Sequence, residues 1–90
     1  MNRNETLDAA KDAINGDRQQ RYGEAGECLG RIAALWNALT GTQQFDAVNV
    51  AIMLGLMKVA RMRTDATHAD NFVDVCGYMA LAAELATGDE

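Results

Sequence analysis

The sequence predicts an all-α protein whose four helices form a compact bundle, completed by homo-oligomerisation. Apolar residues recur at spacings of three and four along most of the chain, no stretch alternates as a strand would, and there is no proline. The 90 residues, 9.7 kDa in all, have the length of one small domain, residues 1–90. A chain this short buries only about 60–65 % of its unfolded surface, so its core is thin and self-association is expected.

The first two helices are each expected to end at a glycine. The first is predicted over Glu5–Asn15, with Asn4 as its N-cap and Gly16 as its stop. The second is predicted over Glu24–Leu39 and is followed by Gly41.

The last two helices are expected to form a hairpin. The third is predicted over Asp46–Met62 and is apolar on nearly every side from Val48 to Met57, which is typical of the most buried, central helix. The fourth is predicted over Ala69–Ala86, behind a capping pattern of Thr67 and Asp70. Because the connection is short, the two helices should run antiparallel, with the end of the third beside the start of the fourth.

The composition excludes several classes of function. Eight Lys and Arg against thirteen Asp and Glu give a net charge of −5, which argues against a nonspecific binder of nucleic-acid polymers or of anionic membranes. The longest uncharged stretch, Ala47–Met57, is too short for a membrane span, and the polar N-terminus lacks a secretory signal. A cytoplasmic protein is expected, with Cys28 and Cys76 as reduced core thiols.

The hairpin brings two cations, Lys58 and Arg61, toward two carboxylates, Asp70 and Asp74. In a structural interpretation, Arg61–Asp74 and Lys58–Asp70 are partly buried ion pairs that fix the hairpin. In a functional interpretation, the cations bind a phosphate, the carboxylates orient them or bind a sugar, and free N–H groups of the fourth helix help. Buried ion pairs seldom improve stability over apolar packing, so both interpretations stay open.

A second cationic segment lies between Gly16 and Gly23. It is either a solvated connector or an anion-binding loop with an aromatic ring for stacking on a base. Tyr78 is a candidate core anchor or a ligand platform. The predicted ligand-binding set is Arg18, Arg21, Tyr22, Lys58, Arg61, Asp70, Asn71, Asp74 and Tyr78.

A metal site is the alternative chemistry. Glu24 and Glu27 lie three apart and could share magnesium with Asp70 and Asp74, although carboxylates at a helix start also favour the helix dipole. His68 is expected in a capping or exposed role, because no nucleophile accompanies it.

Four segments together resemble a group of short proteins encoded by tailed phages and prophages. They are GDR…YG at 16–23, RIAALWNALTG at 31–41, KVAR at 58–61 and DNFVDVCGY at 70–78. The chain more distantly resembles the MazG-like all-α nucleoside triphosphate pyrophosphohydrolases, which hold magnesium through E-x-x-E and E-x-x-D. Glu24-x-x-Glu27 matches the first motif, whereas Asn71-x-x-Asp74 has asparagine in place of glutamate. In size and class the chain also resembles the helical sponge proteins that sequester cyclic nucleotide signals of bacterial defence.

Three hypotheses follow. The leading one is a non-enzymatic homo-oligomer without catalytic residues or a cofactor, which sequesters a linear or cyclic nucleotide. The second is a magnesium-dependent nucleotide pyrophosphohydrolase, and the third is a module that binds a host protein through an apolar face. The base of the ligand and the order of the oligomer stay open.

Overall fold

The computed structural model describes residues 1–16 and 24–88, and within these residues it contains four helices and no strand. The helices are α1 (Arg3–Asn15), α3 (Ala25–Thr40), α4 (Ala47–Arg61) and α5 (Ala69–Thr87). The prediction of an all-α protein is thus confirmed. None of the described helices has the length and apolar character needed to cross a membrane.

Local caps fix where three of the helices begin: α1 begins two residues before its predicted start, and α3 and α4 each begin one residue after theirs. The side chain of Asn2 accepts a 2.8 Å hydrogen bond from the N–H of Glu5, whose carboxylate accepts one from the N–H of Asn2, so α1 begins at Arg3 and the predicted cap, Asn4, lies inside it. Asp46 and Asn49 form the same reciprocal cap on α4.

The capping pattern predicted from Thr67 is wrong. The N-cap of α5 is His68, and no side-chain hydrogen bond caps this helix. At the other end of α3, Gly41 adopts the left-handed conformation (φ 67°) and donates its N–H to the carbonyl of Asn37, as expected of a glycine stop.

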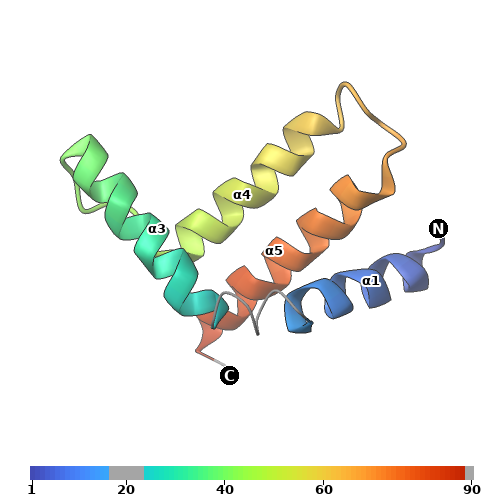
Figure 1. Cartoon of the computed structure of the whole chain (residues 1–90), viewed down its shortest axis with the longest axis horizontal. Coiled ribbons are helices and arrows are strands. Elements are labelled where there is room, and N and C mark those ends of the chain that lie inside the picture. Colours follow the sequence, from blue (N-terminus) through green and yellow to red (C-terminus); the bar gives the residue numbers. More distant parts are fainter. Residues whose placement is uncertain (17–23, 89–90) are drawn as a thin grey trace.

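The helices are arranged as an open array, and within one chain they do not close into the predicted compact bundle (Figure 1). α4 and α5 form the antiparallel hairpin, α1 packs on α5, and α3 crosses the far end of the hairpin. The radius of gyration is 13.7 Å, whereas a compact chain of this length has about 12 Å. α1 and α3 lie apart because each packs on a different part of the hairpin.

The core lies where α3 crosses the hairpin. Leu29, Ala33, Val50, Ala51 and Ala82 are buried there, and half-buried side chains surround them. Trp36 is one of these and meets Phe45 edge to face, with the ring centroids 5.5 Å apart. The predicted central burial of α4 is therefore only partly confirmed, because its side facing away from the hairpin is exposed.

Candidate functional site

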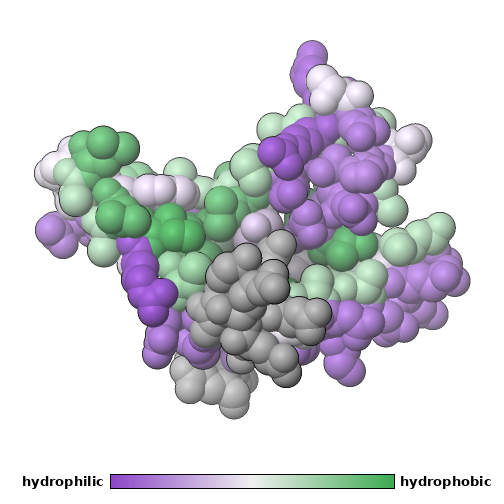
Figure 2. Space-filling view, in the orientation of Figure 1, coloured by the Kyte–Doolittle hydropathy of each residue, from purple (hydrophilic) through white to green (hydrophobic). Residues whose placement is uncertain are grey.

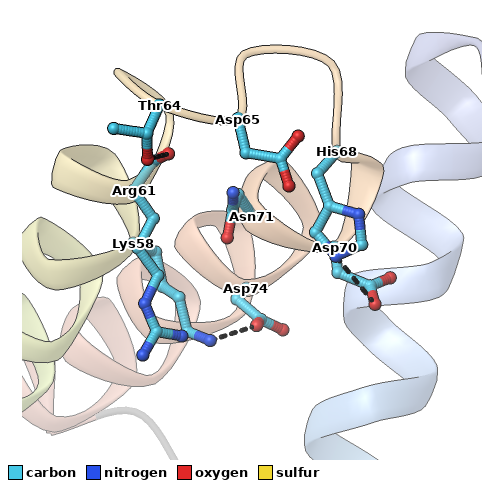
Figure 3. A pocket seen from close by; sticks show the side chains of 8 residues that line it. All are labelled: Lys58, Arg61, Thr64, Asp65, His68, Asp70, Asn71 and Asp74. Carbon is cyan, nitrogen blue, oxygen red and sulfur yellow. Dashed lines mark hydrogen bonds and ion pairs between the residues drawn. The ribbon is translucent and has the colours of Figure 1, made fainter.

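The loop end of the α4–α5 hairpin, where the two helices are connected, holds a pocket of about 380 Å³ (Figure 3). Its walls come from the last turn of α4, the connecting loop and the first two turns of α5. Because the core lies at the opposite end of the hairpin, this end has few apolar side chains to fill it. The pocket is lined by Lys58, Arg61, Thr64, Asp65, His68, Asp70, Asn71 and Asp74.

One ion pair joins the two helices across the pocket. Nζ of Lys58 lies 2.9 Å from Oδ2 of Asp74, and these side chains are 17 % and 32 % exposed. The predicted pairs, Arg61–Asp74 and Lys58–Asp70, are therefore wrong in register. In an antiparallel hairpin, the residue farther from the loop on one helix faces the residue farther from the loop on the other. Of the two cations, Lys58 lies farther from the loop than Arg61, and of the two carboxylates, Asp74 lies farther from it than Asp70. Lys58 and Asp74 therefore face each other.

Asn71 has the most unusual environment in the pocket. It is the one buried polar residue among the described residues, with only 4 % of its surface exposed, and its side chain lines the pocket. No hydrogen bond joins its amide to another residue within 1–16 and 24–88, and no fully buried side-chain polar atom there lacks a partner. The Asn71 side chain lines the pocket, where water or a ligand can satisfy its amide.

The start of α5 adds unused donors to the same place. Without a side-chain cap, the first N–H groups of this helix are left to solvent or a ligand, although the N–H of Asn71 donates to the carbonyl of His68 at 3.2 Å. The His68 side chain is exposed and points toward Asp70, with Nε2 and Oδ2 3.6 Å apart. His68 thus holds the cap position, as expected, but without making the cap bond.

Arg61 is an exposed cation on the wall formed by α4. It forms no ion pair with any residue of the described segments, in contrast to Lys58. The pocket therefore presents one guanidinium available to an anion, one ammonium held in place by Asp74, and two further carboxylates, Asp65 and Asp70. Such a mixed lining suits a ligand that carries both an anionic group and hydrogen-bond donors.

The structure brings together five members of the predicted ligand-binding set, and Tyr78 is not among them. Tyr78 lies one turn beyond Asp74, where its Cβ faces Gly55 across the α4–α5 contact. Arg18, Arg21 and Tyr22 lie outside the described residues. The five members that line the pocket are Lys58, Arg61, Asp70, Asn71 and Asp74.

The sequence interpretation missed three residues of the pocket as ligand contacts: Thr64, Asp65 and His68. All three belong to the loop between α4 and α5. Their position in the sequence could have identified them. Every residue of a short loop between antiparallel helices lies at the same end of the hairpin as the charged residues Lys58, Arg61, Asp70 and Asp74.

The four carboxylates of the predicted magnesium site do not converge within the chain. Glu24 accepts hydrogen bonds from the N–H groups of Gly26 and Glu27 at 3.1 Å each, so it acts as the N-cap of α3. A Cβ on Gly26 would lie 3.1 Å from Leu85, which places the start of α3 at the C-terminal end of α5.

Asp74 lies eleven residues before Leu85, about 16 Å along the helix, and Asp70 lies farther still. Among the described residues there is no group of three or more acidic, His or Cys side chains that could hold a metal ion. The glutamates of the E-x-x-E motif thus stabilise a helix start, at the opposite end of α5 from the aspartates.

Comparison with known proteins places the chain among phage proteins. Residues 5–86 match the family described as "Domain of unknown function (DUF6378)". The chain is 39 % identical over 79 residues to the Gene 55 protein of Mycobacterium phage L5, covering 88 % of this chain and 51 % of that protein. It is 35 % identical over 72 residues to the Gene 55 protein of Mycobacterium phage D29, covering 80 % and 47 %.

The chain thus spans about half the length of these two curated relatives. No solved structure matches it. The expected relation to phage proteins is confirmed, whereas the individual motifs and the MazG-like resemblance stay predictions.

Proposed function

The chain belongs to the DUF6378 family, and we propose that it binds a phosphate-bearing nucleotide in the α4–α5 pocket without turning it over. The observation that carries this proposal is the amide of Asn71. Asn71 is buried, its amide has no hydrogen-bond partner among the described residues, and its side chain lines the pocket, so a ligand that contacts this amide would satisfy it.

The anionic part of the ligand is assigned to three groups that meet at the pocket. The Arg61 guanidinium has no carboxylate partner among the described residues and can bind a phosphate through two parallel hydrogen bonds. The uncapped start of α5 adds N–H groups and the positive end of the helix dipole. Asp74 holds the Lys58 ammonium at the same wall.

The carboxylates determine which phosphate compound fits. Asp65 and Asp70 would repel an inorganic phosphate, whereas they can accept hydrogen bonds from a sugar hydroxyl or an exocyclic amine. A nucleotide offers both kinds of group, and inorganic phosphate offers only the anion. This is the reason to propose a nucleotide as the ligand class.

Sequestration is proposed in preference to hydrolysis because the four carboxylates of the predicted magnesium site, Glu24, Glu27, Asp70 and Asp74, do not converge. Cyclic nucleotides of bacterial defence are included as candidate ligands through the resemblance in size and class to phage sponge proteins. The homo-oligomer that the thin core predicts is a separate proposal, since it concerns a different surface.

Calorimetric titration with linear and cyclic nucleotides, with and without magnesium, tests the proposal, with inorganic phosphate and a nucleoside as controls. We expect a nucleotide to bind at least tenfold more tightly than either control and to be recovered intact, as judged by mass spectrometry after heat denaturation. Arg61→Ala should weaken binding about 10–100-fold, the size of a lost charge-assisted contact.

Arg31→Ala is the matched control, because Arg31 is an exposed helical arginine on α3, paired only with Glu27 at 3.8 Å among the described residues. It should leave the affinity unchanged. The absence of binding across the panel, or equal binding by Arg61→Ala and the unaltered chain, would refute the proposal. Recovery of a monophosphate and pyrophosphate would instead show a hydrolase.

A further inference from the structure

The side of α4 that faces away from the hairpin is apolar and uncovered. Ile52, Leu56 and Val59 lie one turn apart along this side and are 37 %, 55 % and 45 % exposed. Met53 flanks them and is 42 % exposed. These four residues are here called the outer stripe of α4. A helix that is apolar on all sides is normally buried on all sides, and in one chain α4 is not.

The apolar surface continues beyond the outer stripe. Figure 2 shows hydrophobic surface over α3 and in the hollow between α3 and α4. On α3, Leu35 and Leu39 are 68 % and 86 % exposed. Isolated apolar residues on a surface are ordinary, but a contiguous apolar surface on two helices marks a contact with another molecule.

The total surface of the chain gives the size of the missing contact. The accessible area is 6405 Å², whereas a compact monomer of 9.7 kDa exposes about 5,100 Å². The excess is about 1,300 Å² per chain. This excess is an upper limit, because the total surface also counts residues 17–23 and 89–90, and covering it on two chains would bury at most about 2,600 Å² in total, which is enough for an obligate homodimer interface.

The thin core indicates that the partner is a second copy. The buried apolar residues are mainly alanines, and Val50 is the largest side chain that is fully buried in the described part of the chain. A chain that depends on a partner for its stability needs one that is present whenever the chain is made, and another copy of the chain meets this condition.

The charge pattern also allows two copies to meet. The chain carries a net charge of −5, so most contacts between copies would bring like charges together. Three of the four residues of the outer stripe lie in the segment Ala47–Met57, which contains no charged residue, and the fourth, Val59, lies just beyond it, so most of the stripe can face its own copy without that repulsion. A two-fold axis places the same patch on both sides of the contact.

We propose that two copies of the chain associate through the outer stripe of α4, with Leu56 near the two-fold axis. The exposed leucines of α3 extend the contact. Paired in this way, the helices of two chains complete the core that one open array leaves unfinished. The proposal does not depend on nucleotide binding, because the pocket and the stripe use different residues.

Sedimentation equilibrium of the whole chain tests the proposal. We expect a mass near 19 kDa, twice the 9.7 kDa of one chain, at micromolar concentrations. Leu56→Glu should raise the dissociation constant at least about 30-fold, because a central apolar contact is lost and a charge would be buried. Leu7→Glu is the matched control. Leu7 is 58 % exposed, a fraction similar to the 55 % of Leu56, but it lies on α1 and not in the outer stripe. It should leave the dimer intact.

A second measurement covers the case in which Leu56→Glu fails to fold. The urea midpoint of the unaltered chain should rise with protein concentration, because association stabilises only the folded state. A mass of 9.7 kDa at 100 µM and a midpoint independent of concentration would overturn the proposal and leave the stripe for a different protein. Equal dimerisation by Leu56→Glu and the unaltered chain would also overturn it.

Discussion

Two asparagines, Asn71 and Asn37, should respond in opposite ways to replacement by alanine. The amide of Asn37 holds the segment before α4, since it donates to the carbonyl of Phe45 and accepts from its N–H, both at 2.9 Å. The amide of Asn71 has no such bond within the described residues, although it is more deeply buried. The comparison separates an amide that supports the fold from one that is available to a ligand.

The magnitudes follow from the hydrogen bonds that each change removes. Asn37→Ala loses two bonds, each with a net value of about 0.5–1.5 kcal/mol, and regains about 0.6 kcal/mol of helix propensity. Its free energy of unfolding should fall by about 0.5–2.5 kcal/mol. Asn71→Ala loses no bond within the described protein and gains the same propensity of about 0.6 kcal/mol, which the lost packing of a buried side chain partly offsets, so its free energy of unfolding should stay within about 0.6 kcal/mol of the original value.

Ligand binding should show the reverse order. Asn71→Ala should weaken nucleotide binding about 10–100-fold, because a buried hydrogen bond to the ligand is worth about 1–3 kcal/mol. Asn37→Ala should leave the affinity of the folded protein unchanged, since Asn37 lies on α3, away from the pocket.

Urea unfolding followed by circular dichroism measures the first effect, at one fixed protein concentration, and calorimetry measures the second. If Asn71→Ala destabilised the protein as much as Asn37→Ala, the Asn71 amide would have a structural role and would not support a binding site. If it changed neither stability nor affinity, the ligand would not contact this amide.

Two further predictions concern charged groups. In a double-mutant cycle measured by urea unfolding, Lys58→Met and Asp74→Leu should show a coupling energy of about 1–2 kcal/mol. This value lies between those of exposed and buried ion pairs, because the two side chains are 17 % and 32 % exposed. A coupling energy below about 0.3 kcal/mol would contradict the 2.9 Å contact. Glu24→Ala should cost about 1 kcal/mol with or without magnesium, because Glu24 caps α3, whereas Glu27→Ala, which removes an exposed carboxylate, should cost less than about 0.5 kcal/mol. Stabilisation of the unaltered chain by magnesium that Glu24→Ala abolishes would restore the metal hypothesis.

The features that could be predicted from the sequence are those fixed by neighbouring residues. The existence and order of the helices follow from apolar spacing, and the stop at Gly41 follows from its freedom to adopt a positive φ. The grouping of charged residues at the loop end of the hairpin could be predicted, because the short connection brings the end of α4 beside the start of α5. Lys58, Arg61, Asp70, Asn71 and Asp74 were placed in one site by this reasoning.

The features that could not be predicted depend on how the helices cross. Apolar spacing does not state the angle at which α3 meets the hairpin, so the open array was missed. The same limitation explains α4, whose apolar residues on every side predicted central burial. In one chain the outer stripe of α4 is exposed. A helix with apolar residues on every side is therefore fully buried only when another molecule covers this stripe.

The two proposed functions of α4 are geometrically compatible. Successive residues of a helix are about 100° apart, so Lys58 in the pocket and Leu56 in the outer stripe lie about 160° apart around the axis. A second copy seated on the stripe would therefore leave the pocket open to solvent. A dimer built in this way has two separate pockets, each formed within one hairpin, so we expect two nucleotides to bind per dimer without competition. A stoichiometry of one nucleotide per dimer would mean that the copies share a site and that this arrangement of α4 is wrong.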